Sequence, residues 1–397
     1  MTTKEGYIFN ITGNKTQYMG QGEVSKEEKP TVVAKDIDSS HYVRKTEQYF
    51  ANLFDITWAS DGCGKIEYIV NGNLNFKNRE INSSQIANVS ELEIGSYAVT
   101  CRVTSPSGQI ATAEKNVKVT TLASAEVKDK DEKTQTASAI YSEYDFAFFS
   151  DLVNAGQTQI NGKIMNDINL SKVCGNEEGN WNSIGTKSYP YEGILEGAGN
   201  RVEAIYIDTT EEAKGLLGYT QNATIRDMVL GTGSISAGYE VGGLIGNSKE
   251  TTIFNCINHN VSVASKNYIT RSYAWSKGVY TFNYSNTGGI IGYAYNSNIQ
   301  DSINYANCIG NHSGIGGIVG FYEGNRERTI TNCVNYANLS NTASGSACFI
   351  GGIVGECYQL GKIQNSHNRG NINGNGYIAV GGIAGELTGS AMERMYK

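Results

Sequence analysis

The chain has 397 residues, of which 18% are charged and 10% are aromatic, and its formal net charge at pH 7 is −7. This length has room for two or three domains, and the aromatic content, with 25 Tyr, excludes a disordered chain. An acidic chain without a basic run is not expected to bind nucleic acid. No stretch of the sequence approaches about eighteen consecutive apolar residues, so we expect no membrane span.

Residues 1–29 form an N-terminal segment with one predicted strand, at 7–11, which we assign to the end of a preceding domain. The segment lacks the apolar stretch that a signal peptide requires. Between residues 30 and 121 the apolar residues alternate with a period of two, and turn signals such as Asn71-Gly72 interrupt them. This pattern predicts a β-sandwich. Its strands are expected at residues 31–37, 50–58, 65–70, 96–104 and 111–120.

Residues 95–108 resemble the last hairpin of bacterial immunoglobulin-like domains. The resemblance implies that residues 30–121 are an immunoglobulin-like domain, a type that serves mostly as a spacer in surface proteins. Cys63 and Cys101 lie on strands that should be neighbours, and a secreted setting permits a disulfide. Sequence spacing does not show contact, so a bridge and a pair of free thiols both stay open.

Residues 122–137 carry mixed charges without apolar periodicity and predict a charged linker. A helix is expected after it, at about 143–155. Ser142 is suited to cap the start of this helix, with Asp145 three residues on, and Gly156 is suited to end it. Its apolar residues fall on one face. We therefore expect it to cap the open end of a repeat array.

Two short phrases recur in step over residues 138–397 and indicate a repeat architecture. The first is a glycine phrase of the type Gly-Gly-Ile-Val-Gly. It occurs at residues 215–218, 242–246, 288–292, 316–320, 351–355 and 381–385. The second is of the type Ile-x-Asn-Cys or Ile-x-Asn-Ser. It occurs at residues 253–256, 299–302, 330–333 and 363–366, and in a weaker form at 225–228.

Phrases of this length are too short for helices and fit strands of four to six residues. Stacked repeats pair equivalent strands and place like side chains above one another, which predicts a parallel β-solenoid. Its opening rungs are expected at residues 160–214 and its regular rungs at 215–397. The Asn or Asp of the second phrase is expected at a corner with positive φ. Because the last copy is incomplete, we expect the chain to be a fragment.

The two phrases resemble the GLUG repeats of bacterial cell-surface proteins, and residues 161–170 resemble the lead-in of such arrays. The resemblance implies a β-helical surface module and an extracellular, cell-surface location, but it does not imply one activity. Some IgA-specific metallopeptidases carry these repeats. Their zinc motif His-Glu-x-x-His is missing, because none of the 4 His is followed by Glu.

The cysteines of the second phrase, Cys256 and Cys333, occupy one column of the predicted solenoid, with Ser302 on the rung between them. Two rungs place them about 9.6 Å apart. A disulfide needs Cα atoms within about 7 Å. We therefore expect free thiols that fill the core as small apolar residues.

One interval between glycine phrases has 46 residues, whereas the intervals on either side have 28. The excess lies in residues 266–287, where aromatic residues spaced by two flank a Ser-Lys-Gly turn. This spacing predicts a hairpin with one aromatic face, and such faces bind sugars and protein partners. The candidate ligand-binding residues are Tyr273, Trp275, Tyr280, Phe282 and Tyr284. The alternative is that the hairpin folds this face onto the solenoid.

Catalytic signatures are missing from the sequence. No Cys-x-x-Cys occurs, His is too scarce for a metal cage, and the glycine-rich stretches are corners rather than phosphate loops. We expect no catalytic residues, no metal and no cofactor. One carboxylate pair, Glu356 and Glu386, shares a column on consecutive rungs. Two carboxylates about 5 Å apart can share a proton or bind a cation; the alternative is two exposed corner residues.

The sequence therefore predicts an all-β protein, with an immunoglobulin-like β-sandwich followed by a parallel β-helix of GLUG-like repeats that carries an N-terminal helical cap. We expect a non-enzymatic, monomeric fragment of a secreted or cell-surface bacterial protein that binds a glycan or a host protein. The alternatives are a polysaccharide-processing enzyme, a non-catalytic module of such an enzyme or of a surface protease, and a scaffold without a ligand.

Overall fold

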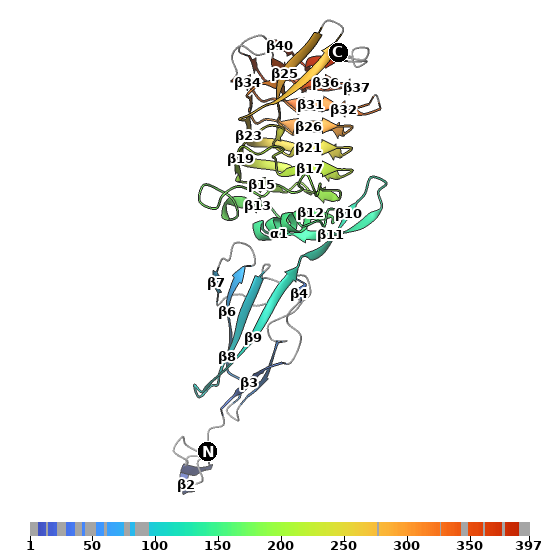
Figure 1. Ribbon diagram of the computed structural model, residues 1–397. Coiled ribbons are helices and arrows are strands. Elements are labelled where there is room, and N and C mark those ends of the chain that lie inside the picture. Colours follow the sequence, from blue (N-terminus) through green and yellow to red (C-terminus); the bar gives the residue numbers. More distant parts are fainter. Residues whose placement is uncertain are drawn as a thin grey trace. The chain divides into compact units, whose positions relative to one another are not determined.

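The computed structural model describes residues 7–12, 15–21, 29–35, 42–43, 53–58, 62–74, 80–83, 95–275, 278–325, 327–342, 348–359, 362–374 and 378–388. The chain divides into two compact units, residues 1–121 and 122–397. Strands dominate both units (Figure 1). The second unit also contains the helix α1 (Glu143–Asn154) and the short 3-10 helix η3 (Leu170–Lys172).

The first unit contains a five-stranded sheet in the order β4-β9-β8-β6-β7, a two-stranded sheet of β3 and β5, and a separate pair of β1 and β2. Its strands are β1 (Tyr7–Thr12), β2 (Lys15–Gln21), β3 (Thr31–Ala34), β4 (Tyr42–Val43), β5 (Phe54–Thr57), β6 (Lys65–Leu74), β7 (Glu80–Ser83), β8 (Gly95–Thr104) and β9 (Ile110–Thr121). Alternate residues of β8, such as Val99 and Val103, are buried, because a strand with one face on a core has a period of two.

Cys63 and Cys101 are both free thiols, and only Cys101 is buried. The register of β6 and β8 explains why they do not meet, since it pairs Tyr68 with Cys101. Cys63 precedes Tyr68 by five residues, which is roughly 17 Å along a β-strand. Of the two outcomes that the sequence left open, the structure has the free thiols.

The segment predicted as a charged linker, residues 122–137, is instead part of the second unit. It forms a hairpin of β10 (Ala123–Lys128) and β11 (Thr134–Ile140), and β11 pairs in parallel with the first solenoid strand. The linker prediction is wrong because the charged residues mark a turn. The carboxylate of Asp129 accepts hydrogen bonds from the backbone N–H groups of Asp131 and Lys133, each at 2.9 Å, which is an Asx-type turn.

The second unit is a β-solenoid, and its strands form four sheets, named A to D. Sheet A contains β10, β11, β12 (Gly162–Ile164), β14 (Ile194–Glu196), β18 (Thr224–Arg226), β22 (Thr252–Phe254), β27 (Asn298–Gln300), β32 (Thr329–Thr331) and β37 (Lys362–Gln364). Sheet B contains β13 (Ile168–Asn169), β15 (Arg201–Glu203), β16 (Ile205–Asp208), β19 (Val229–Ala237), β23 (Ile257–Ser265), β28 (Ile303–Asn304), β29 (Cys308–Gly310), β33 (Val334–Asn335), β34 (Leu339–Asn341), β38 (His367–Asn368) and β39 (Ile372–Asn373).

Sheet C contains β17 (Leu217–Gln221), β21 (Ile245–Lys249), β26 (Ile291–Tyr295), β31 (Val319–Glu323), β36 (Val354–Tyr358) and β41 (Ala384–Thr388). Sheet D contains β20 (Val241–Gly242), β24 (Ile269–Trp275), β25 (Gly278–Gly288), β30 (Ser313–Gly316), β35 (Cys348–Gly351) and β40 (Ile378–Gly381). Equivalent strands of successive rungs pair in parallel, and Figure 1 shows those of sheet C stacked along the coil. The parallel solenoid predicted from the two phrases is confirmed.

The cysteine column of the second phrase has the predicted register. Cys256 and Cys333 are free and buried, and the backbone N–H of Cys256 donates to the Oγ of Ser302 on the rung between them, at 3.3 Å. Burial raises the pKa of both thiols to about 12. Thiols with so high a pKa stay protonated at neutral pH and pack as small apolar groups.

Helix α1 lies against the opening rungs, which are drawn beside it in Figure 1. It begins with a capping box, in which Ser142 and Asp145 each bond the backbone of the other. Phe146 packs on Trp181 with 5.3 Å between ring centroids, and Phe149 packs on Tyr191 at 5.9 Å. All these aromatic side chains are buried. The helix is where the sequence predicted it.

The corner residues of the second phrase form a ladder in which carboxylates and amides alternate over the first four rungs. All of them have positive φ, between 49° and 56°. They are Asp227, Asn255, Asp301, Asn332 and Asn365. The Nδ2 of Asn255 donates to Asp227 at 2.7 Å, and that of Asn332 donates to Asp301 at 2.8 Å. The amides thus keep the two carboxylates two rungs apart.

Replacing Asn255→Asp should destabilise the solenoid by about 0.2–1 kcal/mol at pH 7, because it places three carboxylates on consecutive rungs. The matched control is Asn365→Asp, whose neighbour on the rung before is Asn332. Urea unfolding of both variants at pH 7 checks this. Equal stability of the two variants at pH 7 would contradict the ladder.

A second, internal ladder of asparagines explains the paired glycines of the glycine phrase. Asn304 is buried in sheet B and donates to the Oδ1 of Asn335 at 3.0 Å, and Asn335 donates to Asn368 at 2.8 Å. Each amide lies directly against the second glycine of a phrase. A Cβ at Gly289 would be 2.2 Å from Asn304, and a Cβ at Gly317 would be 2.2 Å from Asn335. No side chain fits there, so the phrase needs glycine.

Replacing Gly317→Ala should therefore lower the free energy of unfolding by about 1–3 kcal/mol, the usual cost of overpacking a core. The control is Gly382→Ala, at the same position of the last phrase, where a Cβ would meet nothing within 4 Å. The measurement is the urea midpoint of each variant. If both variants matched the wild type, the contact between glycine and amide would not constrain the fold.

Candidate functional site

The length of the repeat varies mainly at one corner, where the chain passes from sheet B to sheet D. The segments between the paired strands on either side of this corner are residues 209–213, 237–240, 265–286, 310–314, 341–349 and 374–379. Their lengths run from 4 to 22 residues. In solenoid proteins such insertions gather on one face, often the binding face. The corner between sheets B and D is called the variable corner below.

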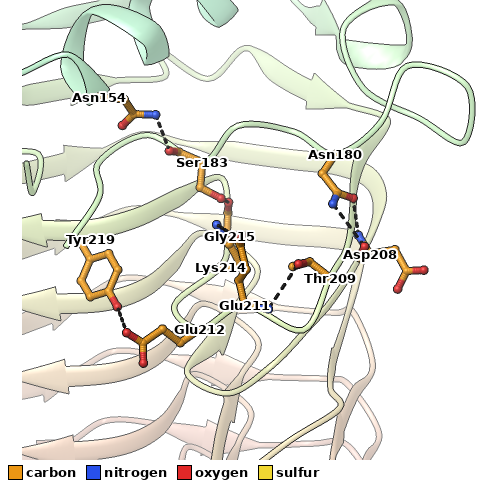
Figure 2. A network of polar contacts seen from close by, with 10 residues as sticks. All are labelled: Asn154, Asn180, Ser183, Asp208, Thr209, Glu211, Glu212, Lys214, Gly215 and Tyr219. Carbon is orange, nitrogen blue, oxygen red and sulfur yellow. Dashed lines mark hydrogen bonds and ion pairs between the residues drawn. The ribbon is translucent and has the colours of Figure 1, made fainter. Parts of the chain in front are cut away.

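At the end of the opening rungs the variable corner holds one residue more than in the next rung, because residues 209–213 occupy the place of residues 237–240. This loop carries Glu211, which is exposed, and Glu212, which is half-buried. Its start is fixed by Asn180. The amide of Asn180 donates to the backbone oxygen of Asp208 at 3.2 Å and accepts from its N–H at 2.6 Å (Figure 2).

The loop and residues 182–187 enclose an open cleft of about 440 Å³. Small-molecule sites have volumes of about 300–1,000 Å³, so the cleft is large enough for a small ligand. It is lined by Asn182, Ser183, Gly185, Thr186, Lys187, Glu211, Glu212, Ala213, Lys214 and Tyr219.

One wall of the cleft is held by the end of α1. The Nδ2 of Asn154 donates to the backbone oxygen of Ser183 at 3.1 Å, and its Oδ1 accepts from the N–H of Gly185 at 2.8 Å. The Oγ of Ser183 in turn donates to the backbone oxygen of Gly215, in the first glycine phrase, at 2.7 Å (Figure 2). The wall is thus tied to both the helix and the solenoid, so the cleft is formed before any ligand binds.

Glu212 is the most highly connected side chain of the cleft. Its Oε1 accepts hydrogen bonds from Tyr219 and Lys187, each at 2.9 Å, and its Oε2 accepts one from Tyr239. Burial alone raises the pKa of Glu212, but these three donors outweigh it and lower the pKa. Burial, and next to it the same carboxylate, raise the pKa of the Tyr219 phenol. At neutral pH Glu212 is therefore a carboxylate held by two phenols and an ammonium group.

The second acidic residue of the cleft is also paired. Lys214 lies 2.8 Å from Glu211, and this contact lowers the pKa of the Glu211 carboxyl. A general acid needs a pKa near the working pH, so that it holds a proton to donate. The pKa of both Glu211 and Glu212 is instead lowered, away from neutral pH. The four charged side chains form two ion pairs, Glu211 with Lys214 and Glu212 with Lys187.

The hairpin predicted at residues 266–287 is present as β24 and β25, which pair antiparallel and lengthen the variable corner to 22 residues in this rung. The register pairs Tyr273 with Tyr280. The side chains of Tyr273, Trp275, Tyr280 and Phe282 lie outside the part of the chain that the structure describes. Tyr284 is described and is buried, with its ring 5.7 Å from that of Phe321. Tyr284 therefore packs on the solenoid and does not reach a ligand.

The base of the hairpin is held by the next turn of the variable corner, residues 310–314. The N–H of Asn311 donates to the Oγ of Ser265 at 2.8 Å, before the hairpin, and the N–H of His312 donates to the Oγ of Ser285 at 3.1 Å, after it. The imidazole of His312 packs on Tyr268, with 4.0 Å between ring centroids. One short turn thus fixes both ends of the hairpin.

Acidification should destabilise the contacts that hold the two ends of the hairpin. Burial lowers the pKa of His312, and its Nδ1 is buried without a hydrogen-bond partner among the described groups. The unfolded chain then takes up the proton first, so stability should fall as the pH drops below about 6.5. The melting temperature of the wild type should fall more between pH 7.5 and pH 5.5 than that of His312→Gln.

The control for this comparison is His259→Gln, at an exposed histidine of sheet B. It should keep the pH dependence of the wild type. A His312→Gln variant that lost as much stability on acidification as the wild type would show that another group titrates.

Glu356 and Glu386 pair on β36 and β41, so their predicted register is confirmed. The alternative weighed for this pair, two exposed corner residues, is wrong for Glu356. Glu356 is only 6% exposed, and burial raises the pKa of the half-buried Glu386. Phe321 precedes Glu356 in the same column and is buried as well. A covered carboxylate does not reach a polymer substrate, so this pair offers no open site.

Sequence analysis missed a column of stacked rings on the outer side of sheet B. The rings of His259 and Tyr305 are 5.4 Å apart and nearly parallel, those of Tyr305 and Tyr336 are 4.8 Å apart, and Arg369 lies 5.5 Å from Tyr336. The repeated Asn-Tyr-Ala-Asn of residues 304–307 and 335–338 is its signal in the sequence. The rings cover each other's faces, so this column presents ring edges rather than a stacking platform.

Groups of three or more His, Cys, Asp or Glu side chains that could hold a metal ion are not found among the described residues. In the same part of the chain, no helix has the length and apolar character needed to cross a membrane. The cleft and the hairpin base both lie at the variable corner, and each has a built arrangement of polar groups.

No protein-family model matches the chain, and no curated protein matches it in sequence. Among solved structures, a similar one is the crystal structure of a candidate immunoglobulin A1 protease from Bacteroides ovatus. It has 15% sequence identity and a TM-score of 0.41, over 62% of this chain and 79% of that chain. Similarity at this level does not transfer an activity to this chain.

Proposed function

We propose that the chain is a non-enzymatic binding module of a secreted or surface-attached bacterial protein. In this proposal the solenoid is an array of GLUG-like repeats that presents the variable corner to an extracellular glycan or host protein. Residues 30–121 are an immunoglobulin-like spacer, and helix α1 is the cap of the solenoid. The observation that carries the proposal is that most of the variation in repeat length, together with built polar contacts, lies at one corner of an otherwise regular coil.

The rigid part of the module supports this assignment. The asparagine ladder and the glycines against it fix the register of every rung from Asn304 to Asn368. Burial of Phe146 and Phe149 of α1 on the opening rungs covers an apolar end that would otherwise face water. A stiff support lowers the entropy that the binding loops lose when a partner binds.

The chemistry of the cleft supports a binding role over a catalytic one. Glu211 and Glu212 are both paired with lysines that lower their pKa, so neither stores a proton at neutral pH for acid catalysis. Paired, oriented polar groups of this kind suit recognition of a ligand by hydrogen bonds. The carboxylate pair that the sequence offered for an enzymatic alternative does not support it, since Glu356 is buried.

The hairpin provides the most direct test. Replacing Trp275→Ala should reduce binding of the isolated chain to its glycan or matrix-protein ligand by about tenfold or more, because aromatic anchors contribute about 2 kcal/mol or more to binding. The ligand is first identified on a glycan array and a panel of extracellular-matrix proteins. Unchanged circular dichroism and melting temperature must accompany the loss.

The control is Tyr358→Ala, an exposed tyrosine of sheet C outside the variable corner. It should bind as the wild type does. If Trp275→Ala left the affinity for every ligand unchanged, the hairpin would not be part of the binding surface. If the wild type bound no ligand on either array, the binding function itself would be refuted.

A further inference from the structure

The charges of the cleft cancel within bonding distance. Lys187 lies 2.9 Å from Glu212, and Lys214 lies 2.8 Å from Glu211. An anion drawn to either ammonium group also meets the carboxylate beside it, and a cation meets the ammonium group beside each carboxylate. At such distances attraction and repulsion offset each other, so the four charged side chains that line the cleft give no net preference for a charged ligand.

The lining of the cleft also disfavours an apolar ligand. Most of its side chains are polar, among them Asn182, Ser183 and Thr186. Covering them with an apolar surface would remove their water without replacing its hydrogen bonds, which is costly. A suitable ligand is uncharged and forms hydrogen bonds over most of its surface.

Hydroxyl groups match what the cleft leaves available. A carboxylate has about four lone-pair sites, and Glu212 uses three of them, for Lys187, Tyr219 and Tyr239. The fourth site accepts from a ligand hydroxyl. The side chain of Lys187 is 75% exposed, so it has N–H groups left that donate to a ligand oxygen. One hydroxyl both donates and accepts, and adjacent hydroxyls satisfy the acid and the ammonium group together.

We propose that the cleft between residues 182–187 and 209–214 binds a neutral sugar residue of a glycan, with Glu212 accepting from one hydroxyl and Lys187 donating to its neighbour. The inference rests on the proposed binding function and adds to it a ligand class and a second contact region apart from the hairpin. The phenols of Tyr219 and Tyr239 orient the carboxylate before the sugar arrives. Glu212 and Lys187 are therefore specificity-determining residues.

The experiment measures binding of the full chain to neutral N-acetyllactosamine, cello- and malto-oligosaccharides, and to sialylated N-acetyllactosamine as the acidic counterpart. Calorimetric titration is done with the wild type, Glu212→Gln and Lys187→Ala. Each variant should weaken binding of the neutral sugar by about tenfold or more, which corresponds to the loss of a charge-assisted hydrogen bond. The control Glu177→Gln, at an exposed acid outside the cleft, should bind as the wild type does.

The wild type should bind the neutral oligosaccharides at least as tightly as the sialylated form. Binding of the sialylated form alone would overturn the inference. So would neutral-sugar binding that is unchanged in both Glu212→Gln and Lys187→Ala. If these variants bind normally while Trp275→Ala does not, the hairpin carries the function and only the cleft assignment fails. Lys187→Ala keeps the test valid if Glu212→Gln is unstable, because Lys187 is largely exposed.

Discussion

The contact between a buried amide and a glycine is the constraint on which the solenoid depends. Asn304 and Asn335 are fully buried, and a buried amide must have its hydrogen bonds satisfied. Each obtains them from its own turn and from the amide of the next rung, which requires the rungs to stay in one register. The amides also lie where a Cβ of the glycine phrase would be. Glycine and asparagine are thus required together, and the register that they fix also aligns the outward-facing residues of successive rungs.

A coil with so fixed an interior tolerates insertions only where the chain leaves the ladder. The corner between sheets B and D does so, and it holds the loop of Glu212, the hairpin of β24 and β25, and the turn of His312. The turn after one insertion anchors the insertion before it, since Asn311 and His312 bond to Ser265 and Ser285. The variable corner is therefore a connected surface built rung upon rung. Loops of this kind bind with a smaller entropic loss than isolated loops of equal length.

The parts of the fold that repeat are the parts that were predictable from the sequence. The phrases alone predicted the parallel stacking, the positive φ of Asn255 and the separation of Cys256 from Cys333, because each recurs in several rungs. The hairpin of residues 123–140 was mistaken for a linker, since its turn is charged and it has only one copy. The cleft was missed for a similar reason. It arises from a single extra residue near Glu211, in opening rungs where no phrase aligns, and only the three-dimensional register reveals it.

The position of the cleft follows from what happens to one column of sheet C along the coil. Tyr219 begins this column, and Asn247, Tyr293, Phe321 and Glu356 follow it on later rungs. From Tyr293 on, the rings close the column, since Phe321 is stacked on Tyr293 at 5.6 Å and covered by Tyr284 of the hairpin. Beyond that point Glu356 is buried and Glu386 is half-buried. At Tyr219 no ring follows on the next rung, and the short loop of Glu212 leaves the corner open. The same column is thus a polar cleft at its start and packed core further on, which explains why the cleft lies at the start of the coil.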